Sequence, residues 1–233
     1  MYPINIIASS KPWNKNLPES LHFATGQRFQ LVVNPAEITA ERLKELNPRY
    51  IFFPHWSHII PADVFQNFEC VIFHMTDLPF GRGGSPLQNL IARGIYETQV
   101  SAIKCIEAVD AGPIYLKRSL SLHGAAEDIY LRASGVIEKM IVEIIKTNPV
   151  PVAQVGEPTF FMRRKPEQGN LLDTENLEQV FDMIRMLDAD GYPNAFINAG
   201  NLRLEFTRVS HKAENLVADV KITFQHQNTE EDK

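Results

Sequence analysis

Residues 70–86 read CVIFHMTDLPFGRGGSP, and the order of apolar, turn and helix-starting residues in this stretch decides the expected fold. The apolar run Cys70–His74 predicts a buried strand. A turn rich in proline and glycine follows, and Pro86 suits the first position of a helix. A strand that leads through a turn into a helix is the repeating element of an α/β sheet.

Strand and helix signals alternate on both sides of this stretch. Further strands are predicted at Ile4–Ala8, Phe29–Val33, Tyr50–Pro54, Glu97–Ile106 and Pro113–Leu122. Helices are predicted from Thr39 to about Leu46, from Pro86 to about Arg93, and from about Ala125 to Thr147. We therefore expect residues 1–150 to form an α/β domain with a mostly parallel central sheet.

The segment Pro149-Val150-Pro151 marks an expected domain boundary. Beyond it, the sequence predicts a short strand near Phe160 and a helix from about Asp173 to Leu187. Two or three strands are predicted within Ala195–Val209 and Leu216–Phe224. Residues 151–233 are therefore expected to form a small α+β module, whose strands could offer a pairing edge for a homodimer.

The composition is that of an ordinary globular protein. Of the 233 residues, 44% are hydrophobic. No apolar run approaches the about 20 residues of a membrane-spanning helix, so no membrane partner is expected. The first residues, MYPINIIASSKPW, lack the basic leader and cleavage site of a signal peptide. Because Cys70 and Cys105 form no Cys-x-x-Cys motif, we expect a cytoplasmic protein without a structural disulfide.

The charge of the chain disfavours a nucleic-acid partner. The formal net charge is −5, whereas a nucleic-acid binder usually needs a clustered basic surface. The longest basic run is Arg163-Arg164-Lys165, and Glu167 follows it. The expectation from charge is therefore that the protein binds no nucleic acid.

Two polar segments follow predicted strands, where an open α/β sheet binds its ligands. His74 closes the strand Cys70–His74, and a histidine there can act as an acid, a base or a hydrogen-bond donor near neutral pH. Asp110 lies between Val109 and Ala111, and a carboxylate beside a histidine orients the ring and favours its protonated form. A structural histidine and a turn aspartate are the alternative interpretations of these two residues.

Three further patterns carry less weight. Gly81–Pro86 could present backbone N–H groups and Arg82 to an anion, although the Lys-Ser/Thr of a nucleotide P-loop is missing. Ser85 could act as a nucleophile, but Leu87 replaces the second glycine of a nucleophile elbow. The histidines of residues 55–58 lack a carboxylate or cysteine partner at motif spacing, so no metal site is expected.

The segment from His74 to Pro86 resembles a motif of the formyltransferases that use 10-formyltetrahydrofolate. This family includes methionyl-tRNA formyltransferase and the nucleotide-sugar N-formyltransferases, and its motif reads His-x-Ser-Leu-Leu-Pro-x-x-Arg-Gly-x-x-Pro. Asp110-Ala111-Gly112 is similar to the family's Asp-x-Gly, and Glu97–Ser101 is similar to its Glu-Thr-x-Val-Thr. The resemblance covers most of the chain, because Ile59–Pro61, Arg164–Pro166 and Ile184–Phe196 are also similar to family segments.

The resemblance implies a Rossmann-like formyltransferase domain with 10-formyltetrahydrofolate as its co-substrate. It assigns His74 to oxyanion stabilisation and proton transfer, and Asp110 to the orientation of His74. The family's catalytic asparagine lies two residues before the histidine, where this chain has Ile72. Asp77 also replaces the first leucine of the family's Leu-Leu-Pro. Thr76, which is polar and two residues from His74, is expected to supply the missing donor.

The resemblance also implies two sets of binding residues. The residues expected at the folate are Ile59, Ile60, Pro61, Glu107 and Val109. The residues expected at an anionic acceptor are Arg82, Gly83, Arg185 and Tyr192, and a surface salt bridge is the alternative for Arg185.

The short C-terminal part and the acidic balance favour a small acceptor over tRNA. We therefore expect the acceptor to be the primary amine of a nucleotide-linked 4-amino-4,6-dideoxy sugar. The formylated sugar would enter surface polysaccharide synthesis, with a pseudaminic-acid type of route as one candidate. A hydrolase of 10-formyltetrahydrofolate is one alternative. A catalytically impaired protein that binds folate or a nucleotide sugar is another, suggested by Ile72.

Overall fold

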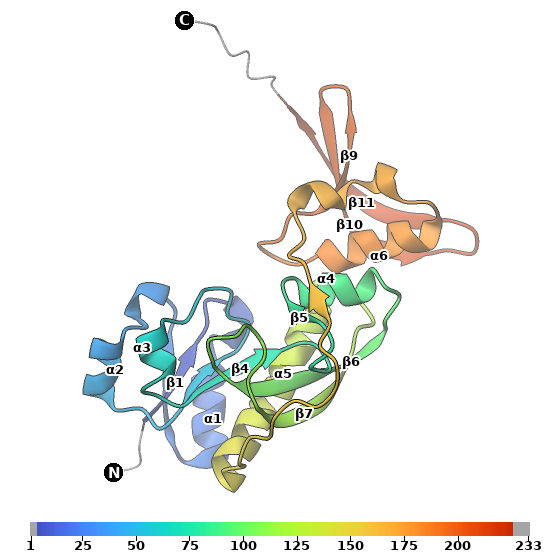
Figure 1. The fold of residues 1–233 in the computed structure, drawn as a ribbon. Coiled ribbons are helices and arrows are strands. Elements are labelled where there is room, and N and C mark those ends of the chain that lie inside the picture. Colours follow the sequence, from blue (N-terminus) through green and yellow to red (C-terminus); the bar gives the residue numbers. More distant parts are fainter. Residues whose placement is uncertain (1–3, 226–233) are drawn as a thin grey trace, which may run out of the picture. The chain divides into compact units, whose positions relative to one another are not determined.

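A six-stranded sheet organises the first of two compact units in the computed structural model, which describes residues 4–225. The strand order is β2-β1-β3-β4-β6-β7 (Figure 1). The strands are β1 (Ile4–Ala8), β2 (Arg28–Val32), β3 (Ile51–Phe53), β4 (Cys70–His74), β6 (Glu97–Lys104) and β7 (Ile114–Ser121). The first four pair in parallel, whereas β6 runs antiparallel to both β4 and β7. The prediction of an α/β fold with a mostly parallel central sheet is confirmed.

Alternate side chains of each strand point to opposite faces of the sheet, and helices bury the apolar ones. Ile6, Ile51 and Cys70 belong to one buried cluster with Leu43 of α2 and Val64 of α3. The helices before residue 150 are α1 (Leu17–Thr25), α2 (Ala40–Leu46), α3 (Ala62–Phe65), α4 (Pro86–Ile91) and α5 (Ala126–Thr147), with 3-10 turns η1 (Pro12–Asn14) and η2 (Pro35–Glu37). Of these, α4 from Leu87 onward and the first turn of α5 belong to the second unit.

The longest helix, α5, has the predicted apolar stripe. Seven of its residues are fully buried at helical spacing, namely Ala126, Ile129, Ala133, Ile137, Met140, Ile141 and Ile144. Full burial of a large aliphatic side chain contributes about 1.5–3 kcal/mol, so this stripe fixes α5 far more strongly than helix propensity does. The predicted cap of α2 is also present, because the Thr39 hydroxyl accepts a hydrogen bond from the Arg42 N–H.

The second unit is a small α+β module built on a three-stranded antiparallel sheet. Its strands are β9 (Ala195–Ala199), β10 (Leu202–His211) and β11 (Leu216–Phe224), in the order β11-β10-β9. Helix α6 (Leu177–Leu187) packs on β10 and β9, and η3 (Pro166–Gly169) and η4 (Leu171–Asp173) precede it. Residues 87–96 and 122–129 belong to this unit together with the chain from residue 163 onward.

A two-stranded parallel pairing in the first unit holds a loop against the following segment. Strand β5 (Arg82–Gly83) pairs with β8 (Phe160–Phe161). This pairing requires a glycine at position 83, because the φ there is +104° and an added Cβ would lie 2.5 Å from the Phe161 carbonyl oxygen. The loop that carries Arg82 is thereby fixed beside the carboxyl end of β4.

Candidate functional site

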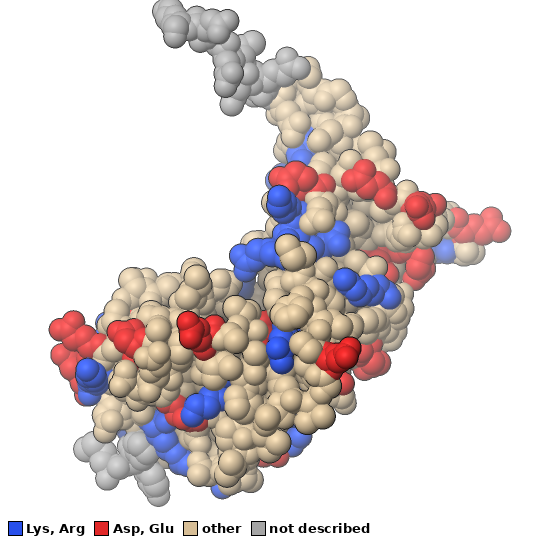
Figure 2. All heavy atoms as spheres, viewed as in Figure 1, with Lys and Arg blue, Asp and Glu red and all other residues tan. Residues whose placement is uncertain are grey.

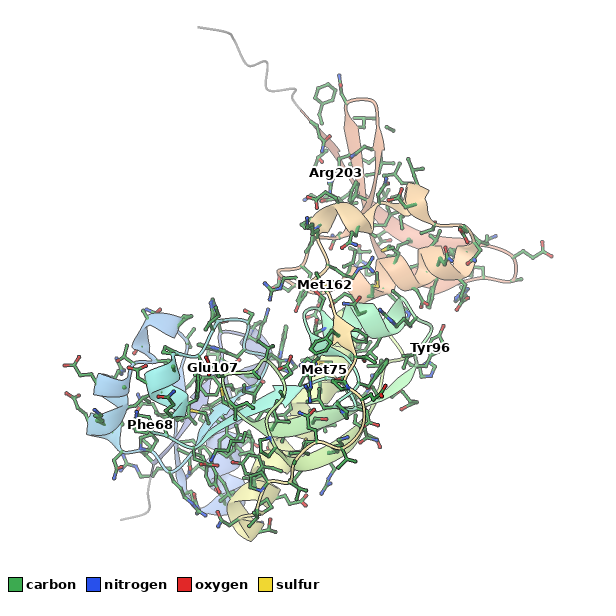
Figure 3. All side chains as sticks on the ribbon, viewed as in Figure 1. Phe68, Met75, Tyr96, Glu107, Met162 and Arg203 are labelled. Carbon is green, nitrogen blue, oxygen red and sulfur yellow. The ribbon has the colours of Figure 1, made fainter. Side chains whose placement is uncertain are left out.

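The site lies in the first unit, where β4 ends at His74. The His74 side chain is only 8% exposed. Its Nε2 donates to the Gly81 carbonyl at 2.8 Å, and its Nδ1 lies 3.5 Å from Asp110 Oδ2. Both ring nitrogens therefore face oxygen atoms that accept hydrogen bonds. Figure 3 labels Met75, the residue after His74, and Glu107, in the loop that leads to Asp110.

Asp110 is held by the backbone as well as by its contact with His74. Its Oδ2 accepts a hydrogen bond from the Gly83 N–H at 2.9 Å, and its own φ is +52°. The third position of Asp110-Ala111-Gly112 must be glycine, because a Cβ there would lie 1.7 Å from the Lys104 carbonyl oxygen. The predicted pairing of His74 with Asp110 is present in the geometry, and their catalytic roles remain predictions.

Gln154 bridges the two loops of the site. Its Oε1 accepts from Arg82 Nε at 3.2 Å and from Arg82 Nη2 at 2.7 Å. Its Nε2 donates to the carbonyl oxygens of Asp110 and Gly112 at 2.8 and 2.9 Å. No sequence signal marks this residue, since it lies outside any helix or strand and matches no motif.

Thr76, expected to supply the missing oxyanion donor, lies beneath the glycine loop. It is fully buried, and its hydroxyl donates to the same Gly81 carbonyl as His74, at 3.4 Å. Its own carbonyl accepts from Ser101 Oγ at 2.7 Å. In this conformation Thr76 supports the loop from inside, and its predicted contact with the reacting group would require the hydroxyl to change partner.

Ile72 occupies the position of the family's asparagine and has an apolar environment. It packs against the buried cluster that contains Ile60 and Cys105. Residues two apart in a strand share a face, so Ile72 lies on the same side of β4 as His74. Position 72 therefore offers no side-chain hydrogen-bond donor beside the histidine.

The residues expected at the folate lie on two loops of the first unit. Ile59, 95% exposed, and Val109, 70% exposed, present apolar side chains to solvent. Ile60 is buried, Pro61 caps α3, and Glu107 is exposed. Ile60 of the loop after β3 and Cys105 of the loop after β6 are buried in the same hydrophobic cluster.

The four residues expected at the acceptor divide between the units. Arg82 and Gly83 lie at the site in the first unit, whereas Arg185 and Tyr192 belong to the second. Arg185 is 3% exposed, donates from Nε to Asp182 Oδ1 at 2.7 Å and donates from Nη1 to the Leu122 carbonyl at 2.6 Å. Its guanidinium also stacks over Tyr96. Arg185 thus binds parts of its own unit together, which differs from both the acceptor contact and the surface salt bridge considered from the sequence.

Other groups weighed from the sequence are not assembled for chemistry. Burial raises the pKa values of both cysteine thiols, that of Cys105 to about 11. Burial and the nearby Lys11 charge lower the pKa of His55 to about 4, so its ring is neutral at pH 7. Across residues 4–225, no three His, Cys, Asp or Glu residues are grouped so that they could hold a metal ion. In the same range, no helix is both long and apolar enough to cross a membrane.

Comparison with protein families finds two matches along the chain. Residues 19–144 match the family described as formyl transferase. Residues 166–223 match the C-terminal domain of methionyl-tRNA formyltransferase.

Individual relatives are also described as methionyl-tRNA formyltransferases. Methionyl-tRNA formyltransferase from Ehrlichia ruminantium (strain Gardel) is 30% identical over 187 residues, which are 78% of this chain and 60% of the relative. The chain thus spans about 60% of the length of such a curated relative. The solved structure of methionyl-tRNA formyltransferase from Clostridium thermocellum is 50% identical, with a TM-score of 0.92, and the match covers 95% of this chain and 99% of that one.

A sugar N-formyltransferase from a Shewanella species is far less similar. It is 13% identical, with a TM-score of 0.70, over 91% of this chain and 99% of the other, which shows a shared fold alone. These findings contradict the predicted nucleotide-linked amino-sugar acceptor, its role in polysaccharide synthesis and the exclusion of nucleic acid. The exclusion rested on the net charge, which averages over the whole chain, whereas phosphate binding depends on the local charge of one surface.

Proposed function

This chain belongs to the formyltransferase family, and from that premise we propose that it transfers the formyl group of 10-formyltetrahydrofolate to the amino group of methionyl-tRNA. The similarity to the Clostridium thermocellum enzyme along nearly the whole chain carries the choice of acceptor. The match of residues 166–223 to the C-terminal domain of the same kind of enzyme supports it. The proposed acceptor places the reaction in the cytoplasm.

The reaction requires an unprotonated amine and a group that stabilises an oxyanion. The amine nitrogen attacks the formyl carbon, and the carbonyl oxygen of that carbon gains the negative charge. The bond from the carbon to N10 then breaks, the amine loses a proton, and N10 takes one. His74 can donate to the oxyanion once its Nε2 exchanges the Gly81 carbonyl for it, while Asp110 keeps the ring in place.

The folate contacts are proposed at the loops after β3 and β6. The exposed Ile59 and Val109 provide apolar surface for the flat pterin ring, and Ile60 and Pro61 fix the first of these loops by burial and by capping α3. Glu107, exposed on the second loop, can accept hydrogen bonds from the polar edge of the ring. The first loop follows a strand that is parallel to β4, and the second contains Asp110, which lies 3.5 Å from His74.

The acceptor's phosphates are proposed to meet the basic segment before η3. Arg163 and Lys165 are exposed, and Arg164 between them is half-buried. Burial and the positive charge of Arg93 lower the pKa of Arg164, so a second cation lies close by in the same unit. Figure 2 shows Lys and Arg side chains gathered on the viewed face of the second unit. A phosphate here would relieve the repulsion among these cations.

The nucleic-acid contact is tested by the salt dependence of tRNA binding. Arg163→Ala and Lys165→Ala should each weaken binding and lower the slope of log K against log salt by about one phosphate contact. Lys146→Ala is the matched control, because Lys146 is exposed on α5 in the first unit. Slopes that equal that of Lys146→Ala would remove this segment from the acceptor surface.

The activity itself is tested by following tetrahydrofolate release with different acceptors. Methionyl-tRNA should support release, whereas uncharged tRNA and free methionine should give only the background rate. Equal release without any amine would indicate hydrolysis of the folate. Folate binding with no release under any condition would indicate a binding protein.

A further inference from the structure

A cavity lies in the first unit, and neither His74 nor Asp110 lines it. Its volume is about 360 Å³, which falls within the roughly 300–1,000 Å³ of small-molecule sites. Among the lining residues, Tyr50 comes directly before β3, Glu69 comes directly before β4, and Tyr115 lies at the start of β7. The cavity is therefore found at the end of β4 opposite to the end that carries His74.

The lining of this cavity is largely aromatic and apolar. The segment Pro149-Val150-Pro151 contributes one part of it, and the rings of Tyr50 and Tyr115 contribute another. Both tyrosines are buried, whereas Val150 is 85% exposed. Aromatic and proline rings offer broad apolar faces against which another ring can pack. The cavity therefore suits a ligand with one ring or a similarly flat apolar body.

Hydrogen bonds within the chain hold this lining in place. The Tyr50 hydroxyl donates to Asn148 Oδ1 at 2.6 Å, and the φ of Asn148 is +47°. Val152, which follows the proline segment, exchanges two backbone hydrogen bonds with Ile114, at 2.7 and 2.9 Å. The cavity is thus formed before a ligand enters, and a preformed site loses less conformational freedom on binding.

Arg49 gives this cavity an uncompensated positive charge. Among residues 4–225, its guanidinium donates to the neutral Asn148 Oδ1 at 3.3 Å and forms no ion pair. Glu69 is neutralised by Lys104, whose Nζ lies 2.9 Å from Oε2, and its Oε1 accepts from the Tyr115 hydroxyl. The two cations and one carboxylate in and beside the cavity therefore leave one positive charge. Because a guanidinium has five N–H donors, Arg49 can bind a carboxylate while it keeps Asn148.

We propose that this cavity binds a small organic anion, in which a flat apolar body carries one carboxylate. The apolar body lies against Tyr50, Tyr115 and the segment 149–151, and the carboxylate pairs with Arg49. A cationic ligand would be repelled by Arg49, and a neutral ligand would leave its charge unpaired. The site is distinct from the folate and acceptor sites proposed above, and it does not depend on that proposed function.

Calorimetry on the full chain with three probes tests the chemistry of this ligand. The chain should bind 3-phenylpropanoate with a dissociation constant of about 1 mM or below, as expected for a ligand of that size. 3-Phenylpropanamide lacks the charge and acetate lacks the ring, so each should bind about tenfold more weakly or worse. Absence of 3-phenylpropanoate binding, or equal binding of the amide, would overturn the proposal. Acetate that binds as tightly would reduce the site to an accessible arginine and would overturn it as well.

Substitutions in the lining show where the probe binds. Val150→Asp places a second carboxylate at the cavity and should weaken binding of 3-phenylpropanoate by about tenfold or more. Val155→Asp is the matched control, because Val155 is 86% exposed in the same segment and does not line the cavity. Arg49→Gln should also weaken binding, whereas Arg42→Gln on α2 should not. Wild-type affinity in Val150→Asp, or an equal loss in Val155→Asp, would contradict the assignment.

Competition with tetrahydrofolate separates this cavity from the folate site, because a folate also joins an aromatic ring to carboxylate groups. Saturating tetrahydrofolate should leave the affinity for 3-phenylpropanoate unchanged, since the two sites share no lining residue. Displacement of the probe by tetrahydrofolate would place it in the folate site and would overturn the proposal.

Discussion

Replacement of Gln154 by leucine should lower turnover while leaving the chain folded. Leucine has a similar volume but removes all four hydrogen bonds by which Gln154 joins Arg82 to the carbonyls of Asp110 and Gly112. The backbone at Asp110 has a positive φ, which needs support from its surroundings. Without Gln154 the carboxylate should sample positions away from His74, which it meets at only 3.5 Å.

The size of the effect follows from the four hydrogen bonds that the substitution removes. A net contribution of about 1 kcal/mol for each hydrogen bond, reduced by the partial exposure of the site, gives a destabilisation of roughly 2–3 kcal/mol. A loss of about 1.4–2.7 kcal/mol of transition-state stabilisation corresponds to a ten- to hundredfold fall in kcat. The affinity for the folate should fall as well, because Asp110 and Gly112 belong to the loop that carries Glu107 and Val109, whereas the loop at Ile59–Pro61 keeps its contacts.

Steady-state formyl transfer and urea unfolding, measured on the same preparations, separate these effects. Gln154→Glu is the informative companion, because it keeps an acceptor for Arg82 but replaces the donor to Asp110 and Gly112 with a carboxylate. It should lose turnover as the leucine variant does. If both variants are destabilised yet retain the wild-type kcat, Gln154 serves stability alone and the reasoning fails.

Three further changes test other parts of the account. Gly112→Ala should cost more than about 3 kcal/mol in urea unfolding, because its Cβ would meet the Lys104 carbonyl oxygen, and a stable variant would contradict the close approach. For His55, whose pKa is lowered to about 4, the unfolded chain binds more protons between pH 6.5 and 4, so the free energy of unfolding should fall by up to about 3 kcal/mol as the pH falls through that window. His55→Asn, which tolerates the φ of +53°, should flatten that slope, and an unchanged slope would assign it to other groups. Ile72→Asn should raise turnover severalfold at a cost of about 2 kcal/mol in stability, whereas unchanged turnover would place position 72 away from the oxyanion.

The regular elements of the fold were predictable from periodicity and end signals. Strand Ile4–Ala8 has the predicted bounds, and α2 begins at its predicted Thr39 cap. Helix α1 was missed because only Leu17 and Leu21 of its nine residues are buried and Phe23 is 94% exposed, so it has no apolar stripe. Helix α3 was missed because four residues are too few to show a helical period.

The site was predictable only where a motif marks it. His74 and Asp110 could be paired because a family motif marks each of them. Strand order alone would not have paired them, since β6 runs antiparallel to β4 and ends opposite Val71. Gln154 could not be found, since its contacts depend on the path of an irregular segment. The burial of Arg185 was also not evident from the sequence, because a charged residue on a helix carries no local sign of the carbonyls that surround it. The acceptor was mistaken because the short C-terminal part and the net charge were weighed against tRNA, and neither describes the local surface that contacts an acceptor.

The most direct test of the central claim is the rate at which N-formylmethionine appears on methionyl-tRNA with this chain and 10-formyltetrahydrofolate. The wild-type chain should form the product, and His74→Ala and Asp110→Asn should each reduce kcat by at least tenfold while folding normally. Absence of N-formylmethionine with the wild-type chain, or full turnover in both variants, would contradict the account.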